Sequence, residues 1–164
     1  MRKSGTSVFI AVAALMACSI AVRAHAADAK TEIEEMEHKF AAATSADEIM
    51  KYVDNSDELV VFDLMTPREF DGPKAVREDF QNAFNSFKNP KIEFVKLQVI
   101  ANGNLGVAES VQHMTATDPS GKPIDTTFRV TDVWRKEKGG WKLIHAHISY
   151  PIDMATGKAD MQSK

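Results

Sequence analysis

The stretch DVWRKEKGGWKLIHAHIS, residues 132–149, decides the fold. Apolar and β-branched residues recur on both sides of Lys138-Gly139-Gly140, and glycines of this kind favour a tight turn between strands. The stretch therefore predicts an antiparallel hairpin, with one strand over 126–136 and the next over 141–150.

Two further strands are expected before this hairpin. They cover residues 91–101 and 105–117, because Asn102-Gly103-Asn104 and Asp118-Pro119-Ser120-Gly121 are turn sequences. The chain after Pro90 therefore reads as antiparallel sheet, and the polar tail from residue 151 is expected to fray.

The first half of the chain reads mainly as helices. Thr31-x-x-Glu34 and Ser45-x-x-Glu48 have the capping-box pattern, and apolar residues follow each at helical spacing. Gly72-Pro73 is expected to open a third helix, since proline is tolerated in the first turn. A short strand, ELVVFDLM over 58–65, comes before it. Helices gathered before a mostly antiparallel sheet predict an α+β domain.

The N-terminus has the pattern of a cleavable secretion signal. Arg2 and Lys3 precede an apolar run over 8–22, and Ala24-His25-Ala26 is a small-residue cleavage site. We expect a signal peptide over 1–26, a single domain over 27–164 and a periplasmic or secreted protein.

A lipid anchor at Cys18 is the alternative, since Leu15-Met16-Ala17-Cys18 resembles a lipoprotein cleavage box. Under the signal-peptide interpretation the mature chain keeps no cysteine.

The charge of the mature chain argues against some partners. Cleavage removes three of the 20 Lys and Arg residues and none of the 23 acids, so the formal charge goes from −3 to −6. A mildly acidic chain without a basic block is not expected to bind nucleic acid. The apolar run is too short for a membrane span. No phosphate loop or dinucleotide fingerprint is present, and no cofactor is expected.

The hairpin at 132–149 resembles the closing hairpin of SnoaL-like domains, in the nuclear transport factor 2 and ketosteroid isomerase superfamily. Val61-Phe62-Asp63 and the segment from Phe70 to Arg77, FDGPKAVR, resemble the strand–loop–helix segment of the same family. The resemblance covers about residues 31–153. It implies a cone-shaped curved antiparallel sheet wrapped around three N-terminal helices, with an internal pocket, and pairing as a homodimer.

The resemblance also implies two catalytic candidates. Asp63 stands nine residues before Gly72, the spacing of the general base in ketosteroid isomerases. Asp132 stands eight residues before Gly140, which matches their protonated, hydrogen-bond-donating aspartate. The sequence leaves simpler roles open: Asp63 as acceptor of loop hydrogen bonds, and Asp132 in a cross-strand ion pair. Phe40 best matches the isomerase tyrosine, and phenylalanine cannot donate a hydrogen bond.

The ligand-binding candidates are mainly apolar side chains expected to line the pocket. They are Phe40, Phe62, Phe80, Phe84, Val130, Trp134 and His147. Strand alternation places Asp132 on one face with Val130 and Trp134. His145 and His147 point the same way by the same rule, but no clear third ligand accompanies them, and no metal site is predicted.

The sequence therefore predicts an exported pocket domain that binds a small hydrophobic molecule. Cofactor-free proton transfer of the isomerase, cyclase or lyase type is one hypothesis for its chemistry. A non-catalytic ligand-binding domain and a dimeric assembly module are the alternatives, because one fold hosts many functions.

Overall fold

The computed structural model describes residues 28–162, so the expected signal peptide and Cys18 lie outside the described residues. The N-terminal helix is already helical at residue 28 and continues to 41. Two further helices follow, α2 (Ala46–Ile49) and α3 (Gly72–Ser86). Within the described range, no helix has the length and apolar character needed to cross a membrane.

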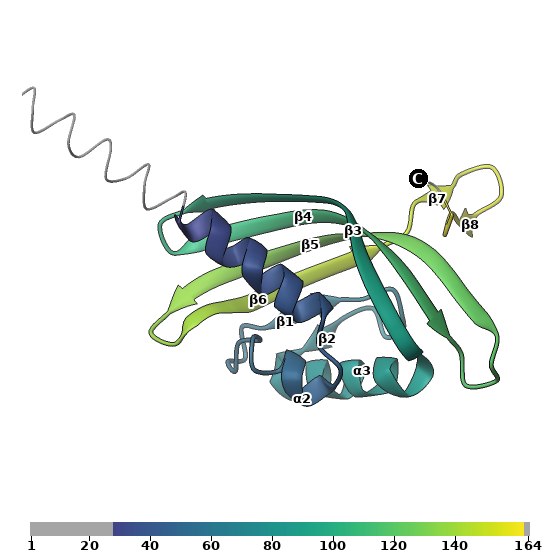
Figure 1. The fold of residues 1–164 in the computed structure, drawn as a ribbon, viewed down its shortest axis with the longest axis horizontal. Helices are drawn as coiled ribbons and strands as arrows, with labels where there is room; N and C mark the ends of the chain where they lie inside the picture. The colour runs from purple at the N-terminus through teal and green to yellow at the C-terminus, as the bar shows by residue number, and fades with distance from the viewer. Residues whose placement is uncertain (1–27, 163–164) are drawn as a thin grey trace, which may run out of the picture.

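The main sheet has six strands in the order β2-β1-β6-β5-β4-β3. The strands are β1 (Val60–Phe62), β2 (Phe70–Asp71), β3 (Lys88–Asn102), β4 (Leu105–Thr117), β5 (Pro123–Glu137) and β6 (Gly140–Ser149). Neighbouring strands are antiparallel except β1 and β6, which run parallel. The expected α+β class with a curved, mostly antiparallel sheet is confirmed (Figure 1).

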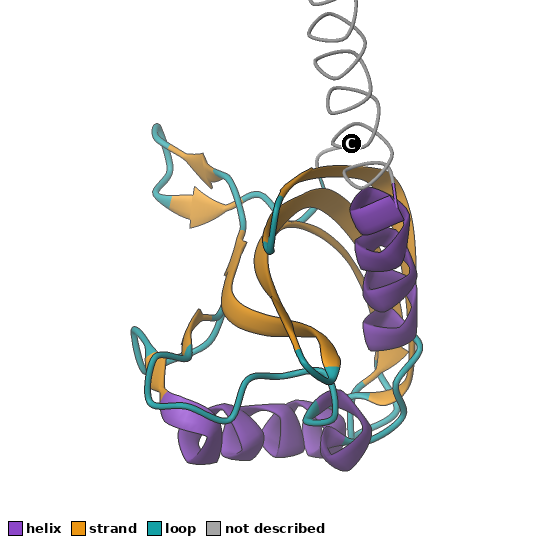
Figure 2. Ribbon diagram, turned by 90° about the vertical axis from the view of Figure 1, so that its left-hand side faces the viewer, coloured by secondary structure: helices purple, strands orange, loops and turns teal. Residues whose placement is uncertain are grey.

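The sheet curls around the helices, so that the N-terminal helix and α3 lie along two sides of one interior (Figure 2). Register shifts interrupt the β3–β4 ladder between Phe94 and Lys96, and the β5–β6 ladder between Val133 and Trp134. Such bulges bend a strand and increase its twist. The curvature puts the inner face of β4, β5 and β6 opposite both helices.

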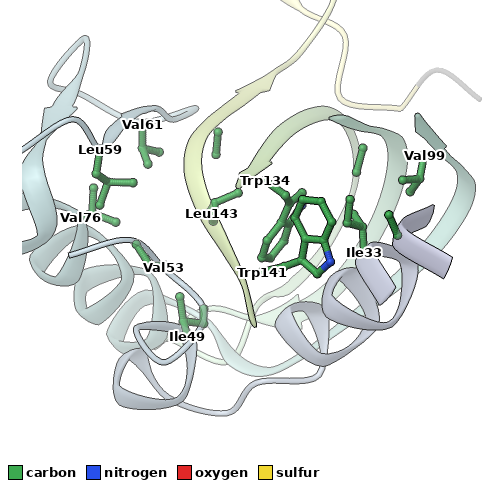
Figure 3. Close-up of a cluster of buried hydrophobic side chains, with 13 residues drawn as sticks. Ile33, Ile49, Val53, Leu59, Val61, Val76, Val99, Trp134, Trp141 and Leu143 are labelled. Atoms are coloured by element: carbon green, nitrogen blue, oxygen red, sulfur yellow. The ribbon is translucent and has the colours of Figure 1, made fainter. Parts of the chain in front are cut away.

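The main core lies where the helices meet this inner face. Figure 3 shows Leu59, Val61 and Val76 on one side of Leu143, and Ile33 with the two tryptophans on the other side. Strand β6 thus separates the part of the core beside α3 from the part beside the N-terminal helix.

The N-terminal helix approaches the sheet closely at Gly106. A Cβ atom at this position would lie 2.2 Å from Cδ1 of Ile33, so only glycine fits without a shift. Gly106 pairs with Trp134 across the β4–β5 ladder, and Trp134 and Ile33 are both fully buried in the main core. The absence of a side chain at one position therefore sets how deeply the helix docks.

A second, smaller cluster lies beyond the main core along β4 and β5. Its buried members are Met114, Phe128 and Val130, and Ile148 packs against both clusters. Among residues 28–162, the buried apolar side chains thus form two groups, and the polar Ser110 and Gln112 are buried between them along β4.

Several expected boundaries differ from the observed ones. Thr31 does not cap the N-terminal helix, because residues 28–30 are already helical. Ser45 does cap α2, accepting from the Glu48 amide at 3.2 Å, but the Glu48 carboxylate reaches Thr44 instead of Ser45. The strand expected over 58–65 is only β1.

The C-terminal tail is folded, although it was expected to fray. It forms a hairpin of β7 (Ile152–Asp153) and β8 (Lys158–Ala159), and then returns to the start of β5. The carbonyl oxygen of Met161 accepts from the Thr127 amide at 3.0 Å. This bond satisfies a backbone group of β5 beyond the point where β6 ends.

Candidate functional site

Both candidate aspartates face the interior. Asp132 is 4% exposed on β5, on the same face as the buried Val130 and Trp134, as the alternation predicted. Asp63 is half-buried directly after β1 and shares the inward side of Val61. One acidic side chain therefore points into the interior from β5, and another from the residue that follows β1.

Sheet register gives the relative position of the two aspartates. Ala146 of β6 pairs with Asp132 on one side and with Val61 on the other. Asp63 lies two residues beyond Val61, so its Cα is displaced from that of Asp132 by about 10 Å across the sheet and about 7 Å along it. A ligand that touched both carboxyl groups would have to span several bonds.

Asp132 forms a carboxyl–carboxyl pair with Glu37 of the N-terminal helix. Ala108 and Ala146 flank Asp132 on the neighbouring strands, and these small side chains leave room for the long Glu37 side chain to reach the sheet. The indole of Trp134 donates from Nε1 to Oε1 of Glu37 at 2.6 Å. The buried Glu37 side chain thus contacts both Asp132 and the indole of Trp134.

Burial raises the pKa values of both members of this pair. The pKa of Glu37 rises to about 7, mainly because burial penalises its charge, while hydrogen bonds from Trp134 and Asp132 lower it. The pKa of Asp132 is raised well above its usual value by burial and by the neighbouring Glu37 charge. Asp132 is therefore the protonated donor of the pair at neutral pH, and Glu37 is the acceptor.

Asp63 forms a second carboxyl pair with Asp79 of α3. The Leu64 amide donates to Oδ1 of Asp63 at 2.7 Å, which confirms the expected loop hydrogen bond. Burial, followed by the charge of Asp63 and its hydrogen bond, raises the pKa of Asp79 to about 7. Burial also raises the pKa of Asp63, against the hydrogen bonds from Leu64 and Asp79. At neutral pH, Asp63 is the charged partner, and Asp79 shares a proton with it.

The cross-strand ion pair considered for Asp132 is not what the structure shows, because the partner of Asp132 is another acid. Asp54 makes a useful contrast, since it is also buried but lies 3.3 Å from the Arg135 guanidinium. In residues 28–162, no Lys, Arg or His side chain is among the groups that shift the pKa values of the four paired acids.

The aromatic candidates Phe40, Phe80 and Trp134 lie together beside Glu37. The Phe40 ring meets the Phe80 ring edge to face at 5.6 Å and the Trp134 ring at 6.3 Å. Phe84 is half-buried against the main core, one helical turn beyond Phe80. These rings connect the N-terminal helix, α3 and β5 around the Glu37–Asp132 pair.

Phe62 and His147 lie on the opposite face of the sheet from the other candidates. Val61 points inward, so alternation turns Phe62 outward, where its ring packs edge to face against His145 and His147 at 5.1 and 5.8 Å. The two histidines do point the same way, as expected. Phe62, His145 and His147 therefore lie on the other side of the sheet from the carboxyl pairs.

Sequence reasoning missed Glu37 and Asp79. Each stands within the apolar stripe of its helix, Glu37 between Ile33 and Phe40, and Asp79 between Val76 and Phe80. The sequence did contain a signal for both residues: each is an acid at a helix position where the apolar spacing predicts a core residue.

The described residues hold no group of three or more His, Cys, Asp or Glu side chains arranged to bind a metal ion. An open groove of about 710 Å³ lies on the outer surface between α2, the start of α3 and the β5–β6 turn. Its lining includes Lys51, Lys74, Arg77 and Lys142 but none of the candidate site residues.

Comparison with known families gives one match over most of the chain. The family model described as the SnoaL-like domain matches residues 23–153. No curated protein matches the sequence.

Solved structures agree with this match. The chain is 26% identical to an NTF2-like protein of unknown function from Pseudomonas putida KT2440, with a TM-score of 0.73, over 84% of this chain and 97% of that one. An NTF2-like superfamily protein from Salmonella enterica serovar Typhimurium is 25% identical, with a TM-score of 0.71, over 82% and 99%. A ketosteroid isomerase-like protein from Erwinia carotovora atroseptica, 16% identical with a TM-score of 0.62 over 73% and 94%, shares the fold.

Proposed function

We propose that this chain, which belongs to the SnoaL-like domain family, is exported from the cytoplasm and binds a small hydrophobic molecule between its curved sheet and its helices. The observation that carries the proposal is the pairing of four acids in the interior, Glu37 with Asp132 and Asp63 with Asp79, of which all but Asp63 are buried. Buried acids without a basic partner cost stability, and groups with shifted pKa values concentrate at functional sites.

The apolar surroundings of the pairs support a hydrophobic ligand. The rings of Phe40, Phe80 and Phe84 are only half-buried although they face the interior. Apolar walls with a few convergent polar groups are the usual construction of a small-molecule site. We infer that ligand binding covers these rings.

Cofactor-free proton transfer is the chemistry that the pairs favour. Asp63, as the charged partner of its pair, is the candidate base for a proton next to a carbonyl group. Asp132, which stays protonated, is the candidate donor to the oxygen that develops charge. Asp132 donates its proton in a hydrogen bond to Glu37. When Glu37 takes up a proton of its own, the pair holds two protons and one of them is free for a hydrogen bond to a ligand.

A non-catalytic binding role is the second candidate. It is favoured by the partners that the acids already have: the Leu64 amide and Asp79 for Asp63, and Glu37 for Asp132. Because these acids already have hydrogen-bond partners within the protein, they can orient a ligand without exchanging protons with it.

The binding proposal is tested by native mass spectrometry of protein purified from its own compartment. We expect a retained small molecule that denaturing conditions release, and an empty protein would contradict the proposal. The catalytic hypothesis is tested separately by assaying Asp63→Asn on a panel of hydrophobic ketones, with Asp71→Asn as control. The Asp71 side chain makes no capping bond and is exposed, and Asn caps equally well. Equal turnover in both variants would exclude Asp63 as the base.

We also propose that the outer face of the sheet pairs two copies of the chain. Phe62 is 38% exposed there beside His145 and His147. Phe62→Glu is expected to convert a dimer into a monomer in light scattering after size exclusion. A wild-type protein that is monomeric at micromolar concentration would contradict this part of the proposal.

A further inference from the structure

The buried charged groups of this domain have one sign. Every buried charged side chain in residues 28–162 is an acid: Glu37, Asp54, Asp79 and Asp132. Only Asp54 lies within salt-bridge distance of a base, Arg135. The interior is therefore a poor environment for a carboxylate or a phosphate, which would meet like charges without a compensating cation.

In the described part of the chain, β4 and β6 turn uncharged side chains toward the interior. The inward side chains of β4 near the pairs are Ala108, Ser110 and Gln112, and Gln112 donates from Nε2 to the Ser110 hydroxyl at 2.9 Å. The inward side chains of β6 are apolar: Leu143, Ala146 and Ile148. Strand β3 packs the apolar Leu97, Val99 and Ala101 against the core. Since Asp54 is matched by Arg135, the unbalanced charge of the interior within residues 28–162 comes from the two carboxyl pairs.

Each pair holds a proton that a cation can displace. The pKa values of Glu37 and Asp79 are both raised to about 7, first of all by burial. A positive charge placed beside a pair favours its ionised form, so cation binding and proton release are coupled. A neutral ligand offers no such exchange.

Aromatic rings adjoin the more deeply buried pair. The Trp134 indole is bonded to Glu37, and the Phe40 ring stands between Trp134 and Phe80. Carboxylates next to aromatic rings are the surroundings in which proteins recognise ammonium groups, through charge and cation–π attraction.

We propose that the interior site selects a cationic hydrophobic ligand, an alkyl- or arylammonium compound, over neutral and anionic molecules of the same size. The inference rests on the proposed function, because it names the ligand class of the same site. It adds the role of Glu37 and Asp79 as residues that determine specificity by charge.

The test compares three probes of one size: 3-phenylpropylamine, 3-phenylpropan-1-ol and 3-phenylpropanoate. Their binding to the mature protein is measured by isothermal titration calorimetry at pH 6 and pH 8. We expect the amine to bind at least about tenfold more tightly than the alcohol at pH 8, the ratio that one charge-assisted hydrogen bond provides. We expect no detectable binding of the carboxylate.

The affinities of the amine and the alcohol should change differently with pH. Amine affinity should rise from pH 6 to pH 8 as the pairs ionise, while alcohol affinity should stay level or fall. At pH 6 the amine should release about one proton, measured by repeating the titration in buffers of different ionisation enthalpy.

Variants identify the residues responsible. Glu37→Gln should reduce the preference for the amine over the alcohol, whereas Glu35→Gln, an exposed change on the same helix, should not. Asp79→Asn with Glu78→Gln as control makes the same comparison on α3.

The outcomes distinguish the two proposals. Binding of the alcohol as tightly as the amine, or tighter binding of the carboxylate, overturns the charge selection and leaves the hydrophobic site standing. Failure of all three probes to bind counts against the hydrophobic site itself. An amine preference that Glu37→Gln and Asp79→Asn both retain overturns the assignment of specificity to these acids.

Discussion

Glu37 is the residue whose chemistry departs most clearly from its sequence context. Most glutamates in helices are solvated, yet this one is 2% exposed and bonded to an indole. Its pKa is raised from 4.5 to about 7, so the folded protein holds a proton that the unfolded chain releases at a lower pH. The contribution of Glu37 to stability therefore falls as the pH rises from about 4.5 through 7.

Glu37→Gln should remove this pH dependence. The fall in unfolding free energy between pH 5 and pH 8 should shrink by about 1–3 kcal/mol, because the amide resembles the protonated acid and does not titrate. Urea denaturation at the two pH values measures the change. Glu35→Gln on the same helix should leave the wild-type slope unchanged, and a slope that Glu37→Gln also retains would show that Glu37 titrates normally.

The sequence was sufficient to find Asp63 and Asp132 but not their partners. The two aspartates stand beside strand and turn patterns that fix their position. Glu37 and Asp79 stand on helices, where an acid near an apolar stripe usually lies at its solvated edge. The burial of Glu37 depends on the small side chains of Ala108 and Ala146 on distant strands, which no local pattern connects to its helix.

At the scale of elements, the docking of the N-terminal helix depends on Gly106. Gly106→Ala should destabilise the protein by about 1–3 kcal/mol, since the new methyl group would overlap Cδ1 of Ile33. Ile33→Val removes that atom, so the double variant should recover part of the loss in thermal unfolding experiments. Gly139→Ala, where nothing lies within 4 Å of the added atom, is the matched control.

The long elements were predictable and the short ones were not. Helix α3 and strands β3 to β6 have turn sequences or proline at their ends, so their expected and observed ranges agree closely. β2 has two residues, too few for any periodicity, and exists because Val60 and Val61 pair with it. The tail hairpin of β7 and β8 likewise depends on tertiary contacts such as that between Met161 and Thr127.

At the scale of the whole molecule, export is the prediction with the widest consequences. Expression of the full chain in a bacterium should give a mature protein that begins at Ala27 and has 138 residues, the 164 of the chain less the first 26. Intact mass spectrometry of the periplasmic fraction measures this.

Cys18→Ser should leave that mass and location unchanged. A chain that begins at a lipid-modified Cys18 and stays in the membrane fraction would contradict the signal-peptide interpretation and support the lipoprotein alternative.

The bonds that dock the N-terminal helix also give the protein an optical probe. The chain has two tryptophans, and both indoles donate to glutamates of that helix, Trp134 to Glu37 and Trp141 to Glu32, each at 2.6 Å. Tryptophan emission therefore reports on one region, the junction of helix and sheet beside the Glu37–Asp132 pair. Protonation of the pair and undocking of the helix can be followed by intrinsic fluorescence, without a label.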